Sequence, residues 1–209
     1  MPSLVILAGS NGAGKSTLYR HLSERFPVFG AIPFINPDEI AKGYFGSYLQ
    51  EDSSKNLRLM LRAGKEALRQ RELFIRKRVD FGFETTLSGN SEIRLIENAK
   101  RLGYRTTMVF IGLDHPALHV MRVKLRVQNG GHHVDPIDIV RRQKRCIENL
   151  KRIQPMVDRL YIVDNSGDGH RLVGLVLQRS SKRSVTMKTI DGIDWYVPIL
   201  NFFKDVDKC

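Results

Sequence analysis

The feature that most constrains the fold is a glycine-rich segment lying between a short apolar run and a helical pattern. Residues 4–8 are all apolar, which is typical of a buried parallel strand. The segment after them matches the pattern G-x-x-x-x-G-K-[ST] throughout: Gly9-Ser10-Asn11-Gly12-Ala13-Gly14-Lys15-Ser16-Thr17. Residues 15–26 then place Leu18, Leu22 and Phe26 on one helical face. The chain is therefore expected to begin with a strand, a glycine turn and a helix.

The same alternation of strand and helix patterns continues along most of the chain. Apolar, β-prone runs predict strands, and apolar residues at helical spacing predict helices. Strands are expected at residues 32–36, 81–86, 104–113 and 159–164, and helices at 38–44, 53–78, 90–102, 116–128 and 136–153. This order predicts an α/β fold with a mainly parallel sheet flanked by helices.

The length and composition fit a single folded domain. The 209 residues are 42% hydrophobic and 27% charged, which excludes disorder of the whole chain. We expect one domain over residues 1–209, with a basic helical lid at about 115–145. Residues 166–209 form a C-terminal appendix of unclear role, with short β-prone pieces at 172–177 and 185–190.

The charge is strongly positive and concentrated. The formal net charge is +12, and residues 55–78 and 115–154 account for +7 and +6 of it, so that the remainder is near neutral. Such a balance points to anionic partners. Apolar runs fall short of the ~20 residues of a membrane helix, and the first residues lack the basic segment of a secretory signal. The two cysteines give no disulfide framework, so the cytoplasm is the expected location and a membrane partner is not expected.

The glycine-rich segment is expected to hold the phosphates of a nucleotide with Mg²⁺. Its glycines let backbone N–H groups turn toward phosphate oxygens, and the helix N-terminus adds partial positive charge there. Lys15 should reach the β- and γ-phosphates, and the Ser16 hydroxyl should bind Mg²⁺. The expected cofactor-binding residues are Gly9, Asn11, Gly12, Ala13, Gly14, Lys15, Ser16 and Thr17.

Two carboxylates at predicted strand ends are candidates for the chemistry. Asp38 follows the second strand, at the sheet edge where parallel sheets bind ligands, and can act as a general base toward a hydroxyl. It can equally cap the short helix that follows it. Glu84 is a charge in an otherwise apolar strand, where a substrate hydroxyl or a Mg²⁺-bound water would justify it. The alternative is a surface glutamate on an edge strand.

A basic hairpin supplies candidate lid residues. Arg122 and Arg126 share a helical face, and Arg141 and Arg142 open the next helix. Gly130 and Gly131 between them can act as hinges that fold the arginines over a γ-phosphate. Some of these arginines must simply face solvent, and spacing alone does not select among them. His132 and His133 are interpreted as polar loop residues, since a third metal ligand is not near them in sequence.

Several other residues are assigned structural roles. In helix 53–78 an apolar stripe is expected to face the core, and four basic residues a solvated face, with nucleic-acid docking as the minority interpretation. The stripe comprises Leu57, Met60, Leu61, Leu68 and Ile75, and the basic face Arg58, Arg62, Lys65 and Arg69. Cys146 is expected to pack inside a helix, and Asp114 and Asp164 to serve as turn or cap residues. The apolar patch at 195–203 is either core or interface.

Four separated blocks, taken together, resemble the zeta-toxin family of P-loop kinases, in particular its short single-domain bacterial branch. They are residues 9–17, residues 35–41 (Ile-Asn-Pro-Asp-Glu-Ile-Ala), residues 83–89 (Phe-Glu-Thr-Thr-Leu-Ser-Gly) and the lid pattern from Arg122 to His132. The resemblance covers about residues 3–166.

The resemblance implies an activity and roles for individual residues. Such kinases use ATP and Mg²⁺ to phosphorylate a sugar hydroxyl of UDP-N-acetylglucosamine or a related nucleotide sugar, and an antitoxin protein can restrain them. By the resemblance Asp38 is the catalytic base, and Glu84 and Thr86 hold the substrate sugar. Arg126 and Arg142 are the closest matches to the catalytic lid arginines, with Arg122 and Arg141 as the alternatives.

Three other functions remain compatible with the sequence. The chain can be a kinase for another metabolite or a nucleoside, with a different acceptor pocket. It can be a nucleic-acid-binding ATPase or polynucleotide kinase that uses the basic blocks, although the 8% aromatic content shows no stacking platform, and nucleic acid is the less expected partner. It can also be a non-catalytic ATP-bound switch.

Overall fold

The computed structural model describes residues 1–45, 53–129, 131, 133–179 and 182–205. Its centre is one seven-stranded sheet with strand order β2-β3-β1-β4-β5-β6-β7. The strands are β1 (Ser3–Ala8), β2 (Phe34–Ile35), β3 (Phe81–Thr85), β4 (Arg105–Gly112), β5 (Arg159–Asp164), β6 (Arg171–Arg179) and β7 (Lys182–Met187). The first five strands are parallel to their neighbours, whereas β6 and β7 extend the sheet in antiparallel pairing. The expected α/β fold with a mainly parallel sheet is confirmed.

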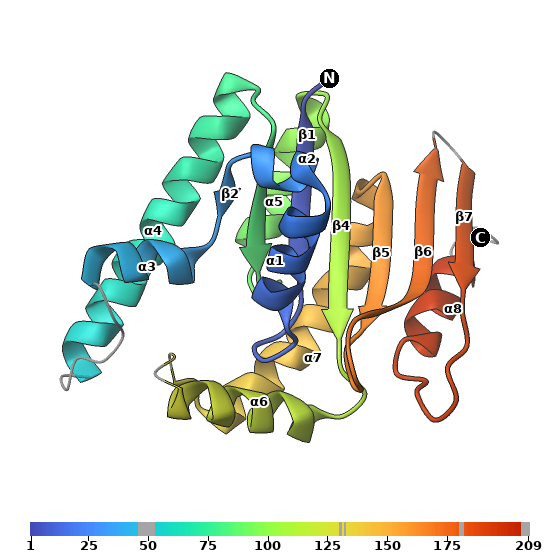
Figure 1. Cartoon of the computed structure of the whole chain (residues 1–209). Helices are drawn as coiled ribbons and strands as arrows, with labels where there is room; N and C mark the ends of the chain where they lie inside the picture. The colour runs from blue at the N-terminus through green and yellow to red at the C-terminus, as the bar shows by residue number, and fades with distance from the viewer. Residues whose placement is uncertain (46–52, 130, 132, 180–181, 206–209) are drawn as a thin grey trace.

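Helices cover the two faces of the sheet unequally (Figure 1). The helices are α1 (Lys15–Arg25), α2 (Pro27–Ala31), α3 (Pro37–Phe45), α4 (Ser53–Lys77), α5 (Ser91–Arg101), α6 (Pro116–Gln128), α7 (Pro136–Ile153) and α8 (Val197–Asp205). The larger core cluster joins buried residues of α4, α5, α7 and α8 to one sheet face. A smaller cluster packs α1 on the other face. Among the described residues, no helix has the length and apolar content needed to span a membrane.

The central strands are apolar. Each has a strand on either side, and helices cover both faces of the sheet. Leu4, Ile6 and Ala8 of β1 are fully buried, as are Phe81 and Phe83 of β3. Strands buried on both faces in this way are typical of parallel sheets covered by helices. Their carboxyl ends therefore meet at one edge, where the glycine turn after β1 and the helices α3 and α6 gather (Figure 1).

The expected apolar stripe on helix α4 is wrong in part. The buried residues of α4 are Ala63, Ala67, Arg71 and Ile75, at helical spacing, whereas Leu61 is 59% exposed and Leu68 is 42% exposed. Small alanines let α4 approach the core closely, which a row of leucines would prevent. The side chain of Leu57 lies outside the described residues. Arg58, Arg62, Lys65 and Arg69 are exposed, as expected for a solvated face.

The C-terminal appendix completes the same core. Tyr196, Ile199, Leu200 and Phe203 are at most 2% exposed and belong to the larger cluster. The apolar patch at residues 195–203 is therefore mainly core rather than an exposed interface. Gly174 of β6 makes this packing possible, since a Cβ there would lie 2.7 Å from Leu200.

Candidate active site

The glycine-rich segment forms a tight turn between β1 and α1. Gly12 and Gly14 have φ angles of +76° and +95°, which only glycine adopts readily. A Cβ at Gly12 would also lie 2.6 Å from the carbonyl oxygen of His119, so the turn must lack side chains there. Gly14 precedes the first residue of α1, and the helix N-terminus therefore opens into the turn. We call residues 9–16 the cradle.

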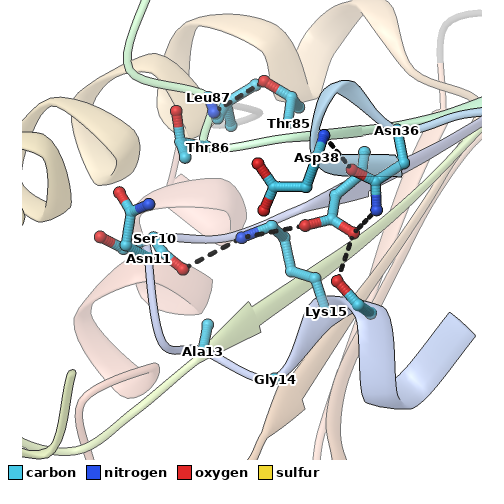
Figure 2. Close-up of polar contacts among 12 residues, drawn as sticks. Ser10, Asn11, Ala13, Gly14, Lys15, Asn36, Asp38, Thr85, Thr86 and Leu87 are labelled. Atoms are coloured by element: carbon cyan, nitrogen blue, oxygen red, sulfur yellow. Dashed lines mark hydrogen bonds and ion pairs between the residues drawn. The ribbon is translucent and has the colours of Figure 1, made fainter. Parts of the chain in front are cut away.

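The cradle contains polar atoms that have no hydrogen-bond partner within the described protein. These are Ser10 Oγ and Asn11 Oδ1, both buried. The Lys15 side chain is 7% exposed and its Nζ donates to the carbonyl oxygen of Ser10 at 3.1 Å (Figure 2). Buried polar groups are ordinarily satisfied. A bound anion would accept hydrogen bonds from the Ser10 hydroxyl and from the backbone N–H groups of the cradle.

Glu84 lies at the cradle and not at a surface edge. It belongs to β3, which is interior to the sheet, and its side chain is 11% exposed. Its Oε2 accepts from Ser16 Oγ at 2.8 Å and from Asn36 Nδ2 at 3.1 Å, and its Oε1 lies 3.6 Å from Lys15 Nζ. A hydroxyl and a carboxylate side by side are the oxygen ligands that Mg²⁺ takes directly or through water. The residues present therefore fit a magnesium ion at Ser16 and Glu84.

Asn36, and not Asp38, caps helix α3. The Asn36 side-chain oxygen accepts from the Asp38 backbone N–H at 2.9 Å, and Pro37 occupies the first helical position (Figure 2). Asp38 is consequently not used as the cap, which was one of its two sequence interpretations. Its carboxylate faces the pocket in front of the cradle, and its Oδ2 lies 3.8 Å from Arg126 NH1.

A pocket of about 1040 Å³ joins these residues into one site. The cradle with the start of α1 lines one part of it, and Met60, Leu61 and Leu68 of α4 line another. The exposed leucines of α4 are thus pocket-lining residues. Other lining residues come from the ends of β2, β3 and β5 and from the lid helices. The size is that of an ordinary site for a small organic ligand.

The four candidate lid arginines do not all face the pocket. Arg122, Arg126 and Arg142 line the pocket, whereas Arg141 does not and is 57% exposed beside Asp138. Arg142 also lies 3.7 Å from Asp138. The lid glycine at 131 packs against Arg126, since a Cβ there would lie 2.5 Å from the Arg126 side chain. Gly130 and His132 lie outside the described residues, so their expected hinge and loop roles stay predictions.

A buried ionic group that the sequence did not reveal forms part of the pocket floor. Arg71 is 3% exposed, donates to the Glu84 carbonyl oxygen at 3.0 Å and lies 3.6 Å from Glu92. Burial lowers the pKa of Arg71, and the carboxylate of Glu92 opposes that shift. Thr85 Oγ1 donates to Glu92 at 3.0 Å, while Thr86 lines the pocket and shares a hydrogen bond with Ser88. These contacts hold the backbone at the end of β3, where Glu84 and Thr86 line the pocket.

The lid is attached to the cradle through His119, a second residue that sequence reasoning missed. His119 is 1% exposed, and its Nδ1–H donates to the carbonyl oxygen of Asn11 at 2.8 Å. Burial lowers the pKa of His119 to about 4, so the ring is neutral at physiological pH. Arg122 and Arg126 follow on the same side of α6, which places them over the pocket. The sequence signal was a histidine at helical spacing from Arg122 and Arg126.

The remaining candidates have structural positions. Asp164 is fully buried, and Cys146 is 1% exposed, where burial raises the pKa of its thiol to about 12. Both are consistent with the structural roles expected for them. Asp114 is exposed, and its N–H donates to Ser166 Oγ at 2.7 Å in the turn after β4. Among the described residues, no cluster of His, Cys, Asp and Glu could hold a metal by itself, and His133 is exposed.

Comparisons with known proteins place the chain among P-loop kinases. The sequence profile described as Zeta toxin matches residues 1–171. An uncharacterized protein of Haemophilus influenzae is 31% identical over 131 residues, which are 62% of this chain and 84% of that protein.

Solved structures share the fold at low sequence identity. A chain of the PezAT chromosomal toxin–antitoxin system of Streptococcus pneumoniae gives a TM-score of 0.63 at 19% identity, covering 98% of this chain and 78% of that one. A chain of the AvrRxo1-ORF1:-ORF2 complex with ATP gives a TM-score of 0.55 at 20% identity, covering 85% of this chain and 59% of that one. Both solved structures therefore share the fold that the sequence predicts for this chain.

Proposed function

The chain belongs to the zeta-toxin family, and from that premise we propose that it is an ATP-dependent kinase that phosphorylates a sugar hydroxyl of UDP-N-acetylglucosamine or a related nucleotide sugar. The observation that carries the proposal is the position of Asp38. Its carboxylate faces the pocket beside the cradle, and the cap of helix α3 is supplied by Asn36 instead. A carboxylate so placed can accept the proton of an attacking alcohol.

The cradle and the lid would handle the charge of the triphosphate. The N–H groups of the cradle and Lys15 would bind the β- and γ-phosphates, with Gly9, Asn11, Gly12, Ala13, Gly14 and Thr17 shaping the turn. Arg126, with Arg142 or Arg122, would approach the transferring phosphoryl group from the lid side. Preorganised cations of this kind stabilise charge that develops in the transition state.

Mg²⁺ would be held by Ser16 together with Glu84, whose carboxylate accepts the Ser16 hydroxyl hydrogen bond at 2.8 Å. Bound there, the ion would neutralise phosphate charge and align the triphosphate. This assignment moves Glu84 from the substrate-holding role implied by the resemblance toward the metal. Thr86, which directly follows β3 and lines the pocket, remains the candidate for holding the acceptor sugar.

A protein partner is also proposed. A structural neighbour of this chain comes from a toxin–antitoxin system. By that likeness we expect an antitoxin to restrain the kinase, and the net charge of +12 favours an acidic one. Co-expression with the product of an adjacent gene, followed by purification and activity measurement, tests this part directly.

A transfer assay tests the kinase proposal. Purified protein, ATP and Mg²⁺ are incubated with nucleotide sugars, nucleosides and short oligonucleotides, and phosphate transfer is followed by mass spectrometry. We expect phosphate on a nucleotide sugar. Asp38→Asn should lower the rate by about 10²–10⁴-fold while ADP still binds, because general-base assistance has that magnitude. Lys15→Ala should weaken both binding and transfer.

Glu39→Gln is the matched control, since Glu39 is the adjacent carboxylate but is exposed and paired with Lys42. It should retain the wild-type rate. Full activity of Asp38→Asn would remove Asp38 from the base role. Phosphate appearing on oligonucleotides alone would replace the sugar acceptor with a nucleic acid.

A further inference from the structure

Trp195, in the later part of the C-terminal appendix, lies at the carboxyl edge of the parallel strands. This residue lies beyond residue 171, where the match to the family profile ends. Its indole ring covers Gly112 at the end of β4, where a Cβ would lie 2.3 Å from the ring. Its Nε1–H donates to Asp164 Oδ1 at 2.9 Å, at the end of β5. The appendix is thus joined to two strands of the parallel sheet at the edge that carries the pocket.

Asp164 connects Trp195 to the loop that follows β5, because it bonds to both. The carboxylate is fully buried and, besides Trp195, accepts hydrogen bonds from Ser166 Oγ at 2.6 Å and Ser166 N–H at 3.2 Å. Arg171, at the far end of the loop, pairs with it at 2.7 Å. Burial opposes ionisation of Asp164, but these bonds outweigh burial and hold its pKa below the usual value. One charged group therefore ties together both ends of the loop at residues 165–170.

That loop, which also lines the pocket, contacts the carbonyl side of the cradle, here called its back. Asn165 Nδ2 donates to the carbonyl oxygen of Ala13 at 2.9 Å, and His170 Nε2 lies 3.2 Å from the carbonyl oxygen of Gly14. The fit is close, because a Cβ at Gly14 would lie 2.3 Å from Asn165 Nδ2. Side chains of one loop therefore hold two consecutive carbonyl groups of the cradle, and the Gly14 carbonyl also accepts from the Leu18 N–H of α1 at 3.0 Å.

Fixing these carbonyls also fixes the N–H groups on the opposite side. In a planar trans peptide the C=O and the following N–H point in opposite directions. Holding the oxygens of Ala13 and Gly14 from behind turns the N–H groups of Gly14 and Lys15 to the front. There they would meet a phosphate at the N-terminus of α1.

We propose that Trp195 is a positioning residue for nucleotide binding: through Asp164 and the 165–170 loop it orients the cradle peptides toward the phosphates. The appendix is then part of the phosphate-binding apparatus and not only an extension of the sheet. The inference rests on the proposed function in so far as the cradle binds a nucleotide. The contacts themselves do not depend on which acceptor is used.

Trp195→Phe tests the inference with Tyr196→Phe as its control. Trp195→Phe keeps an aromatic side chain at this position but removes the hydrogen bond to Asp164 and the outer edge of the indole that covers Gly112. Tyr196→Phe removes the hydrogen bonds of the adjacent buried ring to Lys188 O and Ile190 N, which lie within the appendix. Both variants lose comparable bonds, but only one loses a bond that leads to the cradle.

Two readouts are compared between these variants. In the nucleotide-free protein, amide hydrogen exchange is followed across residues 9–18, where the Ala13 and Leu18 amides are hydrogen-bonded reporters. ADP affinity is measured by calorimetry. Losing a hydrogen bond to a buried charge should speed cradle exchange and weaken ADP binding by about three- to tenfold in Trp195→Phe. Tyr196→Phe should leave both at wild-type values.

A double-mutant cycle locates the path. Asn165→Ala removes the contact with Ala13 directly, and we expect it to weaken ADP binding at least as much as Trp195→Phe does. If Trp195 acts through the loop, the double variant should bind ADP scarcely more weakly than Asn165→Ala alone. Additive losses would overturn the proposed path.

The exchange experiment separates this inference from the proposed function. Unchanged cradle exchange in Trp195→Phe would overturn the inference even if the wild-type protein binds ADP. Failure of the wild-type protein to bind ADP would overturn the proposed function, while faster cradle exchange in Trp195→Phe alone would still support the positioning role.

Discussion

The front and the back of the cradle differ in how their polar groups are paired. Behind the cradle, Asn165 and His119 make hydrogen bonds of 2.8–2.9 Å to its carbonyl groups. In front, Glu84 accepts from Ser16 Oγ at 2.8 Å, but its charge contact with Lys15 spans 3.6 Å, and Arg126 and Asp38 are 3.8 Å apart. Ser10 Oγ and Asn11 Oδ1 make no hydrogen bond within the described protein.

This difference indicates which groups hold the structure and which await a ligand. Short, closed hydrogen bonds in a buried place rigidify the backbone. Longer charge contacts are easily exchanged for contacts with a phosphate, a metal or a substrate, and the groups are already at the correct edge of the sheet. Pairing among the front groups also limits the repulsion between like charges in the pocket. The following three changes test the division.

Arg126→Ala should produce the largest change. Its guanidinium faces Asp38 in the pocket, so its loss should lower the transfer rate by about 10²–10³-fold, as for other preorganised transition-state donors. The measurement is the rate at saturating ATP and acceptor. Arg141→Ala, on the exposed side of the lid, should stay within about twofold, because exposed ion pairs contribute little. Equal losses in both variants would mean that the pocket-lining position does not select the acting arginine.

Glu84→Gln should have an intermediate effect and should act on the metal. Replacing the carboxylate beside Ser16 with an amide should raise the Mg²⁺ concentration for half-maximal activity by about 10–100-fold. A magnesium titration at fixed ATP measures this. If Glu84 holds the acceptor sugar instead, the acceptor KM should rise while the magnesium dependence stays as in the wild type.

His119→Asn should have the smallest effect, seen as altered acid stability. Because the folded-state pKa is about 4 and the ordinary value is 6.5, the stability due to neutral His119 is present above pH 6.5 and lost as pH falls toward 4. By pH 5.5 the loss is about 1 kcal/mol of the free energy of unfolding. Asparagine can still donate to Asn11 but does not titrate, so the variant should lose less stability between pH 7 and pH 5.5. Urea unfolding at the two pH values measures the difference. His170, whose pKa burial also lowers, is common to both proteins, and parallel losses would contradict the assignment.

The strand–turn–helix start and most strands were predictable because each follows from local chemistry. A fully apolar run, a glycine turn and a lysine at a helix start all point to one arrangement, and the structure has it. Because the carboxyl ends of parallel strands lie at one edge of a sheet, the sequence also placed Asp38 and Glu84 at the same edge, and both line the pocket. Strand β2, which precedes Asp38, is shorter than expected. The antiparallel addition of β6 and β7 was not predictable, since a short apolar strand does not indicate its neighbour.

Residues whose role depends on distant partners were missed or misassigned. Arg71 was counted in a basic block, yet it is buried, because Glu92 and the ring of Phe83, 4.2 Å away, come from other elements. Leu61 and Leu68 were assigned to the core because apolar spacing does not distinguish a core from a pocket wall. Asn36 as the helix cap was readable in principle, since Asn before Pro is a common helix start.

Gly112 shows how a residue with no side chain can become a sensitive position. The indole of Trp195 occupies the space that a methyl group at residue 112 would need. Alanine scanning normally removes side-chain atoms. At Gly112 it would instead add a methyl group, which would displace the indole ring from the end of β4. If a substitution at Gly112 lowers activity or stability, the cause to consider first is displacement of the Trp195 side chain, which is more than 80 positions away in the sequence.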